Sequence, residues 1–113
     1  MGAPIVYFEV AGPDGAALQS FYSSVFQWDI NAQRTISAAS AGVPGGIRQD
    51  PPATVFYLGV DDVNATQDAI VAAGGTTIIK RMVVPGVVTF GLFKDPAGNV
   101  CGLAEHGSFP TSP

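Results

Sequence analysis

The chain has 113 residues, of which 47% are hydrophobic and 12% charged, and its mean hydropathy is +0.31. This composition excludes an intrinsically disordered chain, and the length favours one domain around one core. The formal net charge of −4, with five Lys and Arg residues that form no basic cluster, argues against nucleic acid or an anionic membrane surface as a partner.

The first half of the chain predicts a strand, a helix and then short strands. Residues Pro4–Val10 are rich in β-branched and aromatic side chains, which favours a strand. Asp14 suits the N-cap of a helix whose apolar side chains recur every three or four residues. That stripe consists of Leu18, Phe21, Tyr22 and Val25. We then expect a strand at Trp28–Ile30, a segment of small residues at Ile36–Ala41, and a turn running into a short strand at Gly42–Ile47.

The second half repeats this order after a connector at Asp50–Ala53, where paired prolines disfavour the interior of a helix or a sheet. A strand is predicted at Thr54–Val60, followed by a helix at Val63–Ala73 that Asp62 caps. Three more strands are predicted at Thr76–Val83, Val87–Lys94 and Val100–Glu105. An offset of 48 residues aligns Asp14 with Asp62, so the pattern indicates an internal repeat of one strand, one helix and three strands.

Short motifs recur in a characteristic order along the chain. They are Tyr7-Phe8-Glu9-Val10, Phe21-Tyr22, Val25-Phe26-Gln27-Trp28, Gly45-Gly46-Ile47, Val60-Asp61-Asp62-Val63, Gly74-Gly75, Val84-Pro85-Gly86-Val87 and Asp95-Pro96-Ala97-Gly98-Asn99. Together they resemble the vicinal-oxygen-chelate superfamily, which includes glyoxalase I, extradiol dioxygenases and bleomycin-resistance proteins. The resemblance covers roughly residues 4–105.

The resemblance implies an α+β fold in which two βαβββ modules form a curved mixed sheet around a cleft, with the helices on the convex side. We expect a single domain over residues 1–113, with module one at about 4–49, module two at about 54–105 and a frayed tail at 106–113. We also expect a homodimer, because family members commonly pair and a chain of this size leaves a sheet edge open and the cleft incompletely closed.

Family enzymes hold a divalent metal ion with His and Glu side chains at four strand positions. By the resemblance, these positions fall on Tyr7, Val55, Gly102 and a residue near Gly46. Valine and glycine offer no side-chain donor and a neutral tyrosine is a poor ligand, so we expect no metal and no cofactor. His106 follows the last strand, outside the expected cleft, and Cys101 should be a small buried apolar residue.

Strand alternation predicts which side chains line the cleft. If Tyr7 faces the cleft, Glu9 does so too, while Phe8 and Val10 face the helix. The expected lining is Tyr7, Glu9, Trp28, Arg48, Val55, Tyr57, Arg81, Phe90, Phe93 and Gly102, with Trp28 open to a second interpretation as a core residue. Glu9 needs a partner such as Arg48 or Arg81. It is either one half of an ion pair that joins the modules, or a general base or polar anchor for a ligand.

These features favour a metal-free small-molecule-binding protein of the glyoxalase/bleomycin-resistance type, which encloses an apolar or aromatic compound in its cleft. The alternative is a glyoxalase-like lyase, isomerase or dioxygenase that either depends on a metal or uses Glu9 as its acid/base. The single cysteine, the absence of a long apolar run and the absence of a basic N-terminal region favour a cytoplasmic protein.

Overall fold

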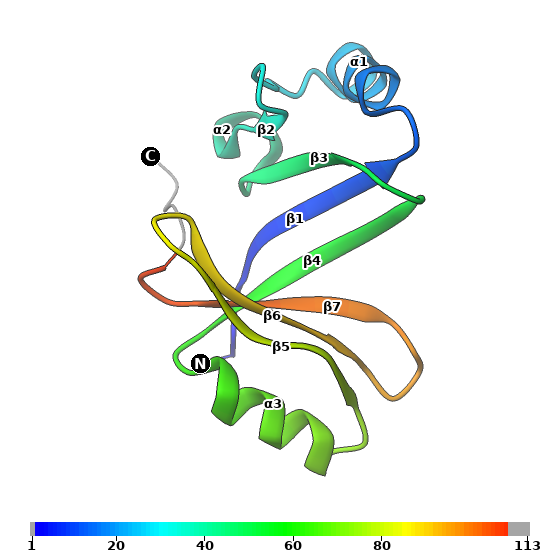
Figure 1. Cartoon of the computed structure of the whole chain (residues 1–113). Coiled ribbons are helices and arrows are strands. Elements are labelled where there is room, and N and C mark those ends of the chain that lie inside the picture. The colour runs from blue at the N-terminus through cyan, green and yellow to red at the C-terminus, as the bar shows by residue number, and fades with distance from the viewer. Residues whose placement is uncertain (1, 109–113) are drawn as a thin grey trace. The chain divides into compact units, whose positions relative to one another are not determined.

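A computed structural model describes residues 2–108 and shows a mixed α+β fold, as predicted (Figure 1). Its elements are β1 (Ile5–Gly12), α1 (Gly15–Phe26), β2 (Thr35–Ile36), α2 (Ala38–Ala41), β3 (Gly45–Gln49), β4 (Ala53–Val60), α3 (Val63–Ala72), β5 (Thr76–Val84), β6 (Val88–Lys94) and β7 (Val100–Glu105). Within the described residues, none of these helices is long and apolar enough to cross a membrane. Residues 109–113, most of the predicted tail, lie outside the described part of the chain.

The described residues fall into two compact units. The N-terminal unit consists of residues 7–55, and the C-terminal unit consists of residues 56–108 together with residues 2–6. Both unit boundaries cut through a strand, since β1 and β4 each contribute residues to both units. That the whole chain forms a single domain stays a prediction.

In the N-terminal unit, the strand order is β2-β3-β1. β1 pairs in parallel with β3, and β2 pairs antiparallel with β3. α1 lies on one side of these strands (Figure 1), where its Leu18 and Tyr22 pack against Val10, Ile36 and Ile47. The predicted N-cap is confirmed, because the side chain that precedes α1 accepts a hydrogen bond from the third helical amide at 3.0 Å.

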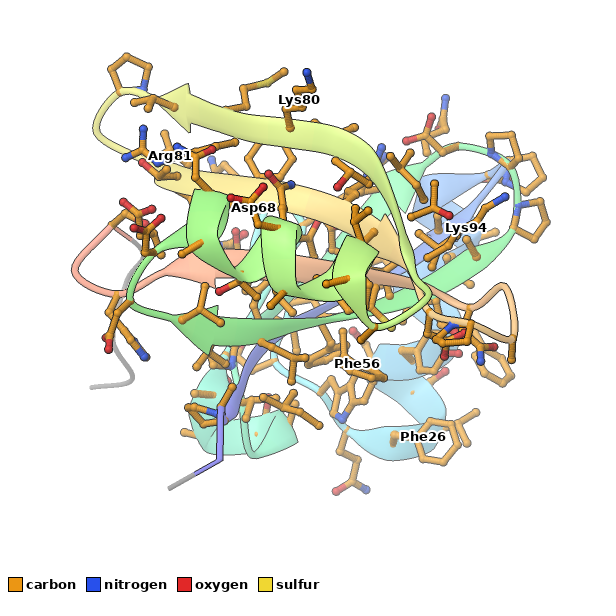
Figure 2. The ribbon with its side chains drawn as sticks, turned by 90° about the horizontal axis from the view of Figure 1, so that it is seen from below. Phe26, Phe56, Asp68, Lys80, Arg81 and Lys94 are labelled. Atoms are coloured by element: carbon orange, nitrogen blue, oxygen red, sulfur yellow. The ribbon has the colours of Figure 1, made fainter. Side chains whose placement is uncertain are left out.

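In the C-terminal unit, the strand order is β4-β7-β6-β5. β4 pairs in parallel with β7, whereas β6 pairs antiparallel with both of its neighbours. α3 crosses one face of this sheet, the face that is nearer the viewer in Figure 2. The core beneath the helix consists of Val63, Phe93, Cys101 and Leu103, so the prediction of a buried Cys101 is confirmed.

In both units, a side chain from the end of a strand accepts a hydrogen bond from the first amide of a helix, α1 in one unit and α3 in the other. The side chain of Gln49, at the end of β3, accepts a hydrogen bond from the Gly15 amide at 3.3 Å. The side chain of Glu105, at the end of β7, accepts one from the Val63 amide at 3.1 Å. Gly15 and Val63 are related by the same 48-residue offset as the two N-caps, so the internal repeat extends to long-range contacts.

A backbone hydrogen bond repeats in the same way. The Asp50 amide donates to the Gly12 carbonyl at 3.0 Å, which ties the end of β3 to the end of β1. The His106 amide donates to the Val60 carbonyl at 2.8 Å, which ties the end of β7 to the end of β4. The structure thus supports the repeat where residue identity between the halves is slight.

The predicted strand at Trp28–Ile30 is wrong. Ile30 makes one isolated bridge with Ile36, and Trp28 lies outside any strand with its ring against the core. The cause is the turn that follows, in which the Asn31 side chain accepts two backbone amides at 3.0 and 2.9 Å. This Asx-type turn leaves too few extended residues to form a ladder.

Candidate functional site

The first strand presents two polar side chains on the face of its sheet that α1 does not cover. Phe8 and Val10 pack on the α1 side, as predicted. Because successive side chains of a strand point to opposite faces, Tyr7 and Glu9 lie on the other side, which we call the N-terminal face. Both side chains are partly buried.

An ion pair lies on the N-terminal face. Glu9 pairs in register with Gly46 of β3, and Arg48 lies two residues further along the same strand. Arg48 Nη1 is 3.4 Å from Glu9 Oε1, and Arg48 Nη2 is 2.8 Å from Asp50 Oδ2. Partial burial opposes the charge on the guanidinium, but Glu9 and Asp50 together raise the pKa of Arg48.

This ion pair identifies the partner of Glu9 and corrects the predicted role of the pair. Of the two arginines proposed as partners for Glu9, the structure selects Arg48. The idea that the pair joins the two modules is wrong, because Glu9 and Arg48 belong to the same module and the same unit. Asp50 lies in the predicted connector, but its position two residues after Arg48 in extended chain is a signal that both side chains share a face.

Tyr7 lies over Gly46 on the N-terminal face. A Cβ atom on Gly46 would be 2.6 Å from the Tyr7 hydroxyl oxygen, so a side chain at residue 46 and the phenol at residue 7 exclude each other. Burial raises the pKa of Tyr7, and the nearby negative charge of Glu9 raises it further, against a smaller opposing effect of Arg48. The phenol therefore keeps its proton at neutral pH.

The C-terminal unit repeats this arrangement on the face that α3 does not cover, which we call the C-terminal face. Tyr57 of β4 pairs in register with Gly102 of β7, and a Cβ atom on Gly102 would run into the Tyr57 ring. Phe90 of β6 pairs with Ala104 of β7, two residues beyond Gly102, so its ring belongs to the same face. Tyr57, Phe90 and Gly102 thus lie on one face of the sheet.

Two aromatic residues predicted to line the cleft lie on the helix side instead. Trp28 stacks on Tyr22 of α1 with 4.8 Å between ring centroids, and its ring meets Phe8 edge-on at 5.2 Å. Phe93 is buried under α3 beside Val63. The prediction fails for Phe93 because its position on β6 has the opposite parity to that of Phe90. For Trp28 the structure supports the second interpretation, because the residue lies outside the strands and packs against the core.

Arg81 is engaged elsewhere in the C-terminal unit. It donates two hydrogen bonds to the Glu105 carboxylate, Nε to Oε2 at 2.9 Å and Nη2 to Oε1 at 2.8 Å. Figure 2 shows Arg81 on β5 beside α3, on the helix side of this unit. The hydrogen bonds from Arg81 lower the pKa of Glu105 to about 2, and the hydrogen bond from the Val63 amide makes a smaller contribution in the same direction. Arg81 therefore holds the carboxylate that accepts the first amide of α3.

A hollow of about 410 Å³ lies at the turn between β5 and β6. It is lined by residues 83–89, four of which are valines, together with Gly107 and Ser108. The predicted cleft residues do not line this hollow, so it does not correspond to the predicted ligand site.

Sequence and structure comparisons identify the family. The profile of the Glyoxalase/Bleomycin resistance protein/Dioxygenase superfamily matches residues 5–103. The chain belongs to this superfamily, as its motifs indicated.

Among curated proteins, the chain is similar to the anthracycline biosynthesis protein DnrV of Streptomyces peucetius. The two are 29% identical over 132 residues, which cover 94% of this chain and 48% of DnrV. The putative glyoxylase CFP32 of Mycobacterium tuberculosis is 28% identical over 106 residues, which cover 80% of this chain and 41% of CFP32. The chain therefore spans about half the length of the curated relatives that it matches.

Solved structures share the fold. A methylmalonyl-CoA epimerase in complex with methylmalonyl-CoA and NH4+ matches with a TM-score of 0.65 and 14% identity, over 98% of this chain and 99% of that chain. The Mn(II)-bound glyoxalase from Novosphingobium aromaticivorans also has a TM-score of 0.65, with 19% identity, over 98% of this chain and 41% of that chain. At such low identities, these matches establish the fold alone.

The residues that the resemblance places at the family's metal positions offer few donor atoms for a metal ion. By the resemblance, these positions fall on Tyr7, Val55, Gly102 and a residue near Gly46, and of the four residues named Tyr7 alone carries a side-chain donor atom. The space beside each glycine is taken by a tyrosine, Tyr7 in one unit and Tyr57 in the other. Within residues 2–108, no three His, Cys, Asp or Glu side chains gather closely enough to hold a metal ion. A catalytic metal normally needs three protein ligands.

Proposed function

We propose that the chain is a metal-free small-molecule-binding protein of the glyoxalase/bleomycin-resistance type, and that an apolar or aromatic compound binds against a helix-free sheet face. The observation that carries this proposal is the pair of tyrosines that lie over Gly46 and Gly102. Each tyrosine puts an aromatic surface and a phenol where a ligand side chain for a metal would need space. Such a face suits recognition by ring packing and hydrogen bonds better than chelation.

The charged side chains of the N-terminal face support a preference for a positively charged ligand. The Glu9 side chain is 17% exposed and that of Asp50 is 46% exposed, so two carboxylates surround the one guanidinium of Arg48. The cluster has a net negative charge, as does the whole chain. A flat aromatic compound that carries a positive charge therefore fits this face better than an anionic one.

An anthracycline is a suitable probe, because it combines a planar ring system with a protonated amino sugar, and because one relative is named for anthracycline biosynthesis. We expect saturable quenching of anthracycline fluorescence on titration with the protein, unchanged when divalent metal ions or a chelator are added. Replacing Glu9 with Gln should weaken binding about three- to tenfold, since a partly screened ion pair is lost.

The matched control is Asp68→Asn, because Asp68 lies on the exposed side of α3 and its loss changes the net charge of the chain by the same amount. This variant should bind as the parent chain does. If both variants weakened binding equally, the loss would come from the change in net charge and not from the removal of Glu9. Binding that requires a metal ion would contradict the proposal.

A further inference from the structure

Arg48 is shared unequally between the two carboxylates of the N-terminal face. Its Nη2 atom is 2.8 Å from Asp50 Oδ2, the usual length of a charge-assisted hydrogen bond, whereas its Nη1 atom is 3.4 Å from Glu9 Oε1. Glu9 is the more buried of the two acids, so water screens its charge less and a closer contact with the arginine would be expected there. The structure has the opposite order, with the shorter contact at the exposed acid.

The backbone at the end of β3 fixes the position of Asp50. Its amide donates a hydrogen bond to the Gly12 carbonyl at 3.0 Å, which keeps this residue beside the end of β1. Pro51 follows, and a proline ring disfavours helical backbone at the residue before it, which limits the conformations open to Asp50. An aspartate side chain is short, so its carboxylate stays where the backbone places it. The long side chain of Arg48 can instead adjust to either acid.

We propose that Asp50 determines the preference of this site for a positively charged ligand, because it keeps Arg48 from pairing closely with Glu9. The inference rests on the function proposed above, in which a cationic aromatic compound suits the N-terminal face. When the positive group of such a ligand pairs with Glu9, Arg48 gives up its longer contact and keeps the shorter one with Asp50. Without Asp50, the same step would take from the guanidinium the carboxylate that it then pairs with most closely, and a buried-side cation would face the ligand.

The first measurement needs no ligand. In the parent chain, Glu9→Gln removes the longer contact of Arg48, so the urea midpoint of unfolding should fall slightly. In Asp50→Asn, Arg48 is able to move closer to Glu9, so the fall caused by the same Glu9→Gln should be at least about twice as large. Any other contact of Glu9 is lost in both chains alike and cancels in this comparison. An equal or smaller fall would overturn the proposal, because Arg48 would not have moved.

The second measurement separates the charge of the ligand from its rings. The probes are an anthracycline, which carries a protonated amino sugar, and its aglycone, which keeps the planar rings without that charge. Asp50→Asn should weaken anthracycline binding about two- to fivefold, since the ion pairs involved are partly exposed, and leave aglycone binding unchanged. Asp68→Asn, with the same change in net charge, should leave the binding of both probes unchanged.

A third variant tests whether Asp50 acts through Arg48. In an Arg48→Met chain there is no guanidinium to hold, so adding Asp50→Asn should weaken anthracycline binding by less than about twofold. A larger loss there would overturn the proposal, because Asp50 would then act on the ligand directly. Equal weakening of both probes by Asp50→Asn would overturn it too, because the charge of the ligand would not matter.

The two measurements distinguish this proposal from the function on which it rests. A parent chain that binds both probes, with Asp50→Asn binding them equally well, would overturn the role of Asp50 and leave the proposed function standing. A parent chain that binds neither probe would contradict the proposed function instead. The unfolding comparison, which involves no ligand, would then still decide whether Asp50 holds Arg48 away from Glu9.

Discussion

Tyr7 and Tyr57 each rest on a glycine of the neighbouring strand, and this contact explains why glycine is required there. Neither Gly46 nor Gly102 has a positive φ, so backbone conformation does not demand the residue. What demands it is the aromatic ring or hydroxyl that occupies the space of a Cβ atom. Alternation along the strands predicted that Tyr57 and Gly102 share a face, but not that one covers the other, because the cross-strand register was unknown.

Gly102→Ala should therefore destabilise the protein by about 1–3 kcal/mol, as expected for overpacking of a well-packed site. The reason is the clash with the Tyr57 ring, so the cost should fall sharply when Tyr57 is Ala. Urea unfolding of the parent, both single variants and the double variant measures this coupling. Additive costs, with no coupling between the two sites, would contradict the close approach.

At the scale of elements, local signals were predictable and long-range ones were not. Asp14 and Asp62 could be identified as N-caps because the amides that they satisfy are three residues away. α2, a single turn that Ser37 caps, was missed because four small residues carry no apolar period. The roles of Gln49 and Glu105 at the helix starts were missed too. Their amide partners are 34 and 42 residues away in the sequence, so no local pattern reveals the contacts.

Glu105 connects three elements of the C-terminal unit, since it ends β7, holds Arg81 of β5 and accepts the first amide of α3. Its pKa falls from 4.5 to about 2 in the folded chain, so its contribution to stability is complete above pH 4.5 and is lost as the pH falls toward 2. Glu105→Gln should cost about 1–2 kcal/mol at pH 7, because water screens the partly exposed Arg81.

The pH dependence distinguishes this ion pair from general packing. The free energies of unfolding of the parent and of Glu105→Gln should converge between pH 4.5 and 2. Denaturant unfolding at several pH values in this window measures the difference. A cost of Glu105→Gln that stays constant down to pH 2 would mean that the carboxylate is not ionised against Arg81.

At the scale of the whole molecule, the two units are built alike and specialised differently. Each pairs its first and last strands in parallel, caps its longer helix with aspartate and places a tyrosine over a glycine. The N-terminal face adds the Glu9–Arg48 ion pair, whereas the C-terminal unit has its arginine–glutamate pair at the start of α3. Sequence periodicity predicts the shared plan, but the side on which each ion pair lies depends on the three-dimensional register.

The single tryptophan and the single cysteine belong to different units, and this placement has a practical consequence. The single tryptophan, Trp28, packs against the core of the N-terminal unit, and the single cysteine, Cys101, is in the core of the C-terminal unit. The chain thus carries one optical and one chemical reporter, one in each half, without any labelling. If residues 1–113 unfold as one cooperative domain, the emission of Trp28 and the reactivity of the Cys101 thiol toward a disulfide reagent should change at the same denaturant concentration. Separate midpoints would show that one half can open while the other stays folded.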